Sequence, residues 1–114
     1  MREEEILSRW DESLALLDEY EALLSPSQQQ ALRMYFRFNL SLSEIAEERG
    51  ISREAAFDAV NKGLSNMRRY EESLHLVKKT QAASEARRIL EEANDLIQAK
   101  MALDVLKEAF DDGI

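Results

Sequence analysis

The sequence of residues 41–60 constrains this chain most, because it predicts two helices joined by a sharp turn. Ser41 and Glu44 have the spacing of a capping box, in which each side chain hydrogen-bonds the backbone N–H of the other residue. Gly50 supplies the positive φ that a sharp turn needs, and Ser52 suits the cap of the next helix. Together these features predict a helix-turn-helix motif, whose second helix commonly enters the major groove of DNA.

The rest of the chain also favours helices. One proline and three glycines among 114 residues leave few of the turns that a β protein needs, whereas Ala, Leu, Glu, Arg and Gln favour helix. Apolar residues at steps of three and four predict a first helix from about Glu3 to Leu24, and a second helix from Pro26 to about Arg37 follows. We therefore expect an all-α fold.

Small and apolar residues predict how the two motif helices pack. We expect Ile51 to anchor the turn in the core. The predicted inward faces are Leu42, Ile45 and Ala46 on the first motif helix and Ala55, Ala56, Ala59 and Val60 on the second.

The second motif helix is predicted to continue past Gly63 to about Ser73. Residues 76–110 then carry another long apolar pattern without proline, which predicts one or two helices with a bend near residues 99–101. This apolar stripe is too long to face water. It either packs on the first helix or pairs with a second copy of the chain, and the sequence leaves both alternatives open.

The net charge of −8 is unevenly distributed. Residues 1–25 hold two basic and eight acidic side chains, residues 26–81 hold nine basic and seven acidic, and residues 82–114 hold four basic and eight acidic. The helix-turn-helix region is thus the only segment that is not acidic. A phosphate-bearing partner would meet that segment, and a basic protein would prefer the flanks.

Residues around the motif carry a family resemblance. Residues 24–29, Leu-Ser-Pro-Ser-Gln-Gln, precede a helix, and with residues 41–48 and 50–53 they form a pattern similar to region 4 of bacterial sigma factors. The continuation at residues 69–76, Arg-Tyr-Glu-Glu-Ser-Leu-His-Leu, is more specific. With it, the chain resembles the YlxM family, small helix-turn-helix proteins associated with the signal recognition particle, over about residues 14–80.

This resemblance implies a sigma region 4-like helix-turn-helix core with an N-terminal helix and a helical C-terminal extension. We assign residues 1–75 to the helix-turn-helix domain and residues 76–114 to the extension. The resemblance further implies a non-enzymatic accessory or regulatory component of the signal recognition particle pathway, with the GTPase of the particle and its RNA as partners.

The candidate contact residues lie on the outward side of the second motif helix and its continuation. Glu54 and Asp58 on the same side would repel the phosphates of DNA. A protein, or structured RNA contacted through Arg68, Arg69, Lys78 and Lys79, is therefore favoured over DNA. Phe57 either stays exposed for a partner or turns into the core beside Ala56. The alternative function is a DNA-binding transcriptional regulator. The predicted partner-binding residues are Arg53, Phe57, Asn61, Lys62, Arg68 and Arg69.

Basic pairs also occur beyond the motif. Lys78 and Lys79 are candidates for contacts to an RNA backbone. Arg87 and Arg88 precede Glu91 and Glu92 by four residues, which is the spacing of surface ion pairs on a helix.

Signals of catalysis or membrane insertion are absent from the sequence. There is no cysteine, His75 is the only histidine, and no glycine-rich loop could hold a phosphate. We therefore expect no enzyme, no metal and no cofactor. No apolar run approaches a membrane span and the first residues form no signal core, so we expect a cytoplasmic protein without a membrane partner. A homodimer remains open.

Overall fold

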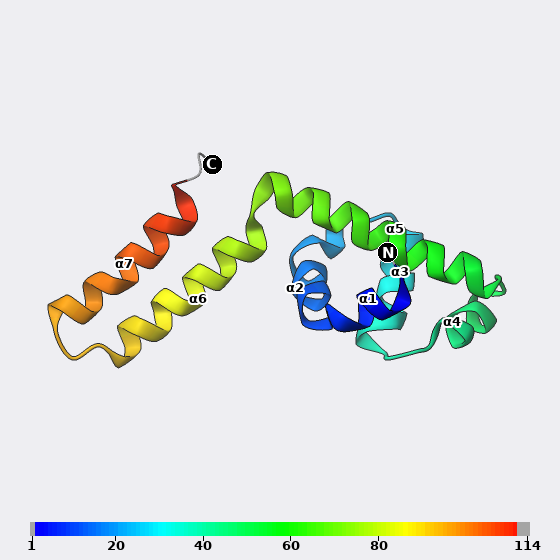
Figure 1. Cartoon of the computed structure of the whole chain (residues 1–114), viewed down its shortest axis with the longest axis horizontal. Coiled ribbons are helices and arrows are strands. Elements are labelled where there is room, and N and C mark those ends of the chain that lie inside the picture. Colours follow the sequence, from blue (N-terminus) through cyan, green and yellow to red (C-terminus); the bar gives the residue numbers. More distant parts are fainter. Residues whose placement is uncertain (1, 112–114) are drawn as a thin grey trace. The chain divides into compact units, whose positions relative to one another are not determined.

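The computed structural model describes residues 2–111, and every regular element among them is helical (Figure 1). The predicted all-α fold is thereby confirmed. The chain divides into two compact units, Met1–Glu72 and Ser73–Ile114. This division falls close to the boundary that the sequence analysis placed after residue 75.

The first unit contains the predicted helix-turn-helix motif and the helices that precede it (Figure 1). The motif consists of its last two helices. In chain order the elements are α1 (Glu3–Ser8), α2 (Trp10–Tyr20), the 3-10 turn η1 (Glu21–Leu23), α3 (Pro26–Leu32), the π-helical turn η2 (Arg33–Arg37), α4 (Leu42–Arg49) and α5 (Arg53–Leu74), whose last two residues belong to the second unit.

The first predicted helix is interrupted, so the expectation of one helix over residues 3–24 is wrong. Arg9 leaves the helical conformation, with φ −114° and ψ 32°. Just before it, the hydroxyl of Ser8 donates a hydrogen bond to the carbonyl oxygen of Glu5 at 2.9 Å. A side-chain bond of this kind competes with the helical backbone ladder. The α-helix resumes at Trp10 and ends at Tyr20 in a 3-10 turn.

The second predicted helix has the expected limits, but its last turn is wider than an α-helix. The hydroxyl of Ser25 caps it by accepting a hydrogen bond from the Gln28 N–H at 3.2 Å. At the other end, the Phe38 N–H bonds the Arg33 carbonyl at 3.0 Å, a π-type bond between residues five apart. The wider turn leaves three consecutive residues, 34–36, buried.

The core of the first unit draws on α1 to α5. Tyr20 is fully buried, as predicted. Trp10 is half-buried and contacts the rings of Tyr35 and Phe36, with centroid distances of 5.6 and 4.7 Å. Other apolar side chains of this unit with 2% exposure or less are Ile6, Leu16, Leu17, Ala31, Leu32, Leu42, Ile45, Ala56, Val60, Leu64 and Met67.

Two expected core positions of the motif are exposed. Ile51 is 37% exposed, so it does not anchor the turn in the core. It lies at the tip of the turn, where its backbone N–H bonds the Ala46 carbonyl at 2.9 Å and closes the turn. Ala55 is also exposed, because it is rotated by about 100° from the buried Ala56 on the helix.

The second unit is a helical hairpin of α6 (Leu76–Glu92) and α7 (Leu96–Phe110), which pack on each other. The chain bends at residues 93–95, so the expected bend near residues 99–101 is misplaced. Asp95 caps α7 by accepting from the Gln98 N–H at 2.8 Å. The Gln98 side chain accepts in return from the Asn94 N–H at 2.7 Å. Asn and Asp favour such caps, and this local bonding sets the bend.

Candidate partner-binding surface

The predicted motif turn forms with the expected hydrogen bonds. The Ser41 hydroxyl accepts from the Glu44 N–H at 3.1 Å, and the Glu44 carboxylate accepts from the Ser41 N–H at 3.0 Å. The hydrogen bond from this backbone N–H lowers the pKa of Glu44. Gly50 has φ 67°, and its N–H bonds the Glu47 carbonyl at 3.3 Å, so α4 ends in a Schellman motif. The Ser52 hydroxyl then accepts from the Ala55 N–H at 3.0 Å and caps α5.

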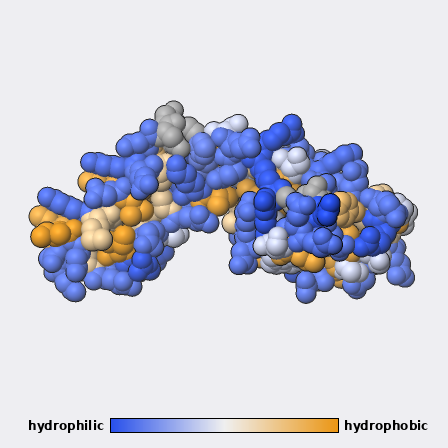
Figure 2. Space-filling view, viewed as in Figure 1, coloured by the Kyte–Doolittle hydropathy of each residue, from blue (hydrophilic) through white to orange (hydrophobic). Residues whose placement is uncertain are grey.

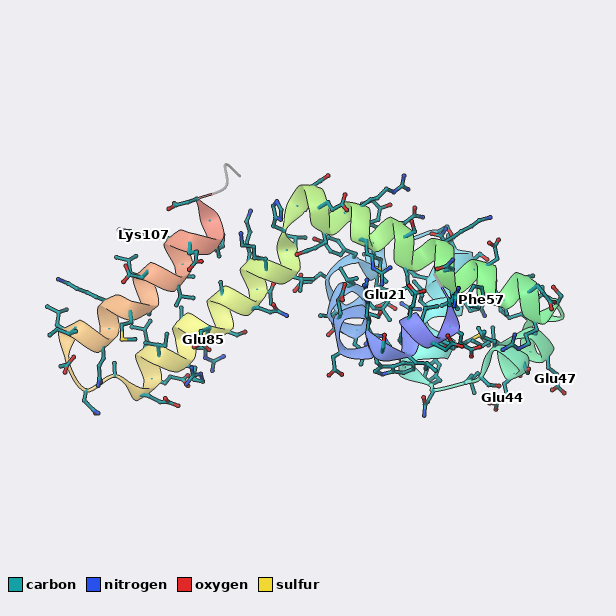
Figure 3. All side chains as sticks on the ribbon, viewed as in Figure 1. Glu21, Glu44, Glu47, Phe57, Glu85 and Lys107 are labelled. Atoms are coloured by element: carbon teal, nitrogen blue, oxygen red, sulfur yellow. The ribbon has the colours of Figure 1, made fainter. Side chains whose placement is uncertain are left out.

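All six predicted partner-binding residues lie on α5, but they do not form one patch. Phe57, Asn61 and Arg68 share one flank of the helix, beside its buried face, and each is half-buried. Lys62 and Arg69, seven residues apart, lie on the outermost side and are exposed. Figure 3 labels Phe57 on α5 and Glu44 and Glu47 on α4. The sequence left open whether Phe57 is exposed or turns into the core. In the structure it is half-buried, so neither alternative describes it fully.

Most cations of the predicted surface are paired with acids of the same chain. Arg53 Nη2 lies 2.9 Å from Glu3 Oε2, and Lys62 Nζ lies 2.9 Å from Asp58 Oδ2. Arg68 Nε lies 3.9 Å from a carboxylate oxygen of Glu12 on α2. The acidic N-terminal segment thus neutralises two cations of α5, a relation that the sequence analysis did not predict.

Arg69 differs from these three cations. Its guanidinium hydrogen-bonds the neutral side-chain oxygen of Asn66, and within residues 2–111 no carboxylate pairs with it. The Asn61 amide has no hydrogen-bond partner within the same described range. These two residues retain polar groups that an external partner could use.

Lys79 is not available as an RNA contact. It is only 9% exposed, and its Nζ lies 5.2 Å from the centre of the Phe110 ring, in a cation–π contact within the hairpin. Arg87 Nε pairs with Glu91 at 3.0 Å and Arg88 Nη1 with Glu92 at 3.3 Å. These last two ion pairs confirm the prediction from the sequence.

An apolar groove on the first unit was missed by the sequence analysis. It has a volume of about 750 Å³ and lies among α3, η2 and α4. Phe38 at its side is 67% exposed. The only sequence signal is an aromatic residue directly after the predicted end of a helix. The lining residues are Pro26, Gln29, Gln30, Arg33, Met34, Phe38, Leu40 and Glu48.

Residues 2–111 contain no group of three or more His, Cys, Asp or Glu side chains placed to hold a metal ion. No helix in that range combines the length and the apolar character that crossing a membrane requires. His75 lies between α5 and α6 with a left-handed backbone, φ 55°.

Comparison with known proteins identifies the family. The model of a family described as "Putative helix-turn-helix protein, YlxM / p13 like" matches residues 7–108. A UPF0122 protein of Halalkalibacterium halodurans is 35% identical over 96 residues, which cover 84% of this chain and 88% of the relative. A UPF0122 protein of Geobacillus kaustophilus is 35% identical over 89 residues, covering 78% of each chain. The family description concerns a helix-turn-helix protein and names no catalytic activity. The chain belongs to this YlxM/p13-like family of helix-turn-helix proteins.

Proposed function

We propose that this protein is a non-enzymatic accessory or regulatory component of the signal recognition particle pathway in the cytoplasm, and that the GTPase of the particle is its direct partner. Membership of the YlxM/p13-like family supports the proposal. The resemblance carried by residues 69–76 and the sigma region 4-like motif implies the pathway.

The pairing of cations with acids is the observation that favours a protein partner over a nucleic-acid partner. Arg53, Lys62 and Arg68 each face a carboxylate of their own chain. Residues 1–72 hold nine basic and fifteen acidic side chains. Such an acidic surface repels phosphate but complements a basic protein surface. A GTPase that binds RNA must present a basic surface to that RNA.

The flank of α5 that carries Phe57 and Asn61 supplies the contact in this proposal. Aromatic residues are enriched at the centres of protein interfaces, and the free amide beside the half-buried Phe57 could hydrogen-bond the partner. Glu54 lies nearby on the same exposed side of the helix and would meet a basic group of the partner, whereas Asp58 is paired with Lys62.

One observation favours the alternative, a DNA-binding transcriptional regulator. Asn61 on the second motif helix could bond an adenine edge in the major groove. This function requires a dimer whose two α5 helices are spaced by about 34 Å, one turn of DNA. Selection from random duplexes should then return a motif that Asn61→Ala abolishes.

A binding titration tests the main proposal. The labelled full chain is titrated with the purified GTPase, the particle RNA and their complex at low and physiological salt. We expect binding to the GTPase without RNA, and we expect Asn61→Ala and Phe57→Ala to weaken it about tenfold or more. Thermal unfolding of both variants separates lost contact from lost fold.

Phe38→Ala is the matched control, because it removes an exposed aromatic ring of the same unit away from α5. It should leave the affinity for the GTPase unchanged. If Phe38→Ala weakened binding while Asn61→Ala and Phe57→Ala did not, the GTPase would contact the groove beside Phe38 and not the flank of α5. Binding to RNA alone would contradict the choice of a protein partner, and no affinity for any of the three at low salt would reject the pathway.

A further inference from the structure

The two helices of the second unit meet through small residues. Ala86 on α6 is 3% exposed, and Ala102 and Ala109 on α7 are 2% and 3% exposed. Small side chains let the helices approach closely, but they bury little apolar area. The larger apolar residues of the hairpin therefore remain outside this contact.

Several of these larger residues lie on one side of the hairpin, whereas the exposed Ile97 and Met101 lie on the other side of α7. Two neighbouring grooves of about 390 and 380 Å³ mark the first side. Leu106 lines both grooves, together with Ala83 and Leu90 in the first and with Leu103 and Phe110 in the second. We name this surface the hairpin face; it consists of Ala83, Leu90, Leu103, Leu106 and Phe110, which line the grooves, and of Leu96, which lies two turns before Leu103 on the same side of α7.

The hairpin face is strongly exposed. Leu90, Leu96, Leu103 and Phe110 are 54%, 69%, 51% and 45% exposed. Hydrophobic surface is visible over α6 and α7 in Figure 2, bordered by hydrophilic residues. Contiguous apolar surface of this kind, with a polar margin, marks an interaction site on a soluble protein.

The spacing of the hairpin face is that of a helical bundle. On α7, Leu96, Leu103 and Phe110 recur every seven residues, with Ala99 and Leu106 between them at steps of three and four. This is the pattern of a coiled-coil seam, which packs against a helix that carries the same repeat. Two such hairpins placed face to face form a four-helix bundle.

The charges at each edge of the face are balanced. Arg87 and Glu91 border it on α6, and Lys107 and Asp111 border it on α7. Each edge thus carries one positive and one negative side chain. On α6 the two groups pair with each other, Arg87 Nε lying 3.0 Å from Glu91 Oε1. A second copy would thus meet edges without net charge, whereas a partner of one charge sign would meet repulsion from one member of each pair.

The area of the face is adequate for a dimer. Seventeen residues of α6 give a length of about 25 Å, and two helices of about 10 Å diameter give a width of about 20 Å. The whole broad side of the hairpin then covers roughly 500 Å² on each copy, or about 1,000 Å² in all, which is the smallest area expected of a biological interface.

We infer that the occupant of the hairpin face is a second copy of this chain, and that α6 and α7 of two copies form an antiparallel four-helix bundle with twofold symmetry. This inference concerns the second unit and does not depend on the partner proposed for the first.

Sedimentation equilibrium of the full chain over a wide concentration range tests the inference. The wild type should sediment as a dimer. Leu103→Glu places an unpaired charge at the centre of the face and should weaken dimerisation at least about tenfold. Because Leu103 is 51% exposed in the single chain, this change should leave the helical circular dichroism signal unchanged.

Ile97→Glu is the matched control. Ile97 is 77% exposed on the same helix, outside the hairpin face, and its replacement adds the same charge. This variant should remain a dimer. A monomeric wild type at every concentration, as expected if the face packs within its own chain, would overturn the inference, as would equal weakening by Leu103→Glu and Ile97→Glu.

Discussion

A Cβ atom built on Gly63 of α5 would lie 2.6 Å from Cδ1 and 3.1 Å from Cγ of Leu32 on α3. Leu32 is fully buried, and Gly63 is buried as well. In a helix interior, glycine costs about 1 kcal/mol relative to alanine. Here the missing side chain is what allows α5 to approach α3, so this cost is offset by close packing.

Gly63→Ala should therefore destabilise the first unit despite the better helix propensity of alanine. Overpacking against Leu32 costs about 1–3 kcal/mol, and the propensity returns about 1 kcal/mol. We expect a net loss of about 1 kcal/mol in the free energy of unfolding, measured with urea at an unchanged m-value.

A double-mutant cycle isolates the contact. In a Leu32→Ala background the colliding atoms are absent, and Gly63→Ala should then stabilise the protein by up to about 1 kcal/mol. An equal destabilisation by Gly63→Ala in both backgrounds would show that Leu32 is not the cause.

The turn at Gly50 allows a second test, because its constraint is purely conformational. Gly50 has φ 67°, and a Cβ there would meet no atom within 4 Å. Gly50→Ala should cost about 1 kcal/mol, whereas Gly50→Asn should cost less, since asparagine tolerates the left-handed region. Urea unfolding of both variants measures the difference, and equal losses would contradict this explanation.

The parts of the fold that could be predicted from the sequence are those formed by residues close together along the chain. The bonds of the capping box at Ser41 and Glu44, the positive φ of Gly50 and the cap at Ser52 each involve residues no more than a few positions apart. The break at Arg9 was missed because the apolar period continues through it. The spacing of apolar residues does not reveal a local hydrogen bond such as the one from the Ser8 hydroxyl to the Glu5 carbonyl.

The hydrogen bond between Tyr20 and Glu71 joins α2 to the end of α5 within the first unit. The Tyr20 hydroxyl, on a fully buried residue, donates to Glu71 Oε1 at 2.5 Å. Tyr20→Phe removes a bond to a charged group and should cost about 1.5–3 kcal/mol. Tyr70→Phe is the control, because the Tyr70 hydroxyl lies 3.5 Å from the Leu23 carbonyl and is exposed.

The Tyr70 control should change the free energy of unfolding by no more than about 0.5 kcal/mol. Both variants keep the ring contact between residues 20 and 70, whose centroids lie 5.8 Å apart. Because the rings remain in both variants, equal losses would show that removing either hydroxyl has the same effect, and that the hydrogen bond with Glu71 adds no specific stability.

Glu21 should make stability depend on pH. Burial raises the pKa of Glu21, but the hydrogen bond from Arg33 and the charges of Arg37 and Arg33 outweigh burial, and the pKa falls below its usual 4.5. A lowered pKa in the folded state contributes stability above the unfolded pKa, and this contribution is lost as the pH falls through the folded value.

Glu21→Gln should thus destabilise the protein at neutral pH by up to about 1 kcal/mol. The difference in the free energy of unfolding between this variant and the wild type should become smaller as the pH falls below 4.5. Glu47→Gln is the control, since the exposed Glu47 side chain has no partner among residues 2–111. A gap for Glu21→Gln that stays constant with pH would contradict the role of the carboxylate charge.

The candidate surface was harder to predict than the fold. The sequence correctly suggests that all six candidates share α5, but not that Glu3 and Glu12 pair with Arg53 and Arg68. Those pairs join residues far apart in the chain, and only the folded structure brings them together. The burial of Lys79 against Phe110 has the same origin.

The pairing of the α5 cations predicts how binding to polyanions depends on salt. For duplex DNA, the logarithm of affinity falls against the logarithm of salt with a slope of about −0.9 per phosphate neutralised. A triple variant, Glu3→Gln, Glu12→Gln and Asp58→Asn, removes the acids that face Arg53, Arg68 and Lys62.

The triple variant should bind non-specific duplex more tightly, with a slope steeper by about 2 units, because Arg53 and Lys62 lose the carboxylates that pair with them and can bind phosphate. The control, Glu4→Gln, Glu5→Gln and Glu47→Gln, changes the net charge equally but removes exposed acids without partners among residues 2–111. Fluorescence anisotropy across a salt series measures both. If the control steepens the slope as much, net charge alone controls polyanion binding, and the pairing of the α5 cations has no part in it.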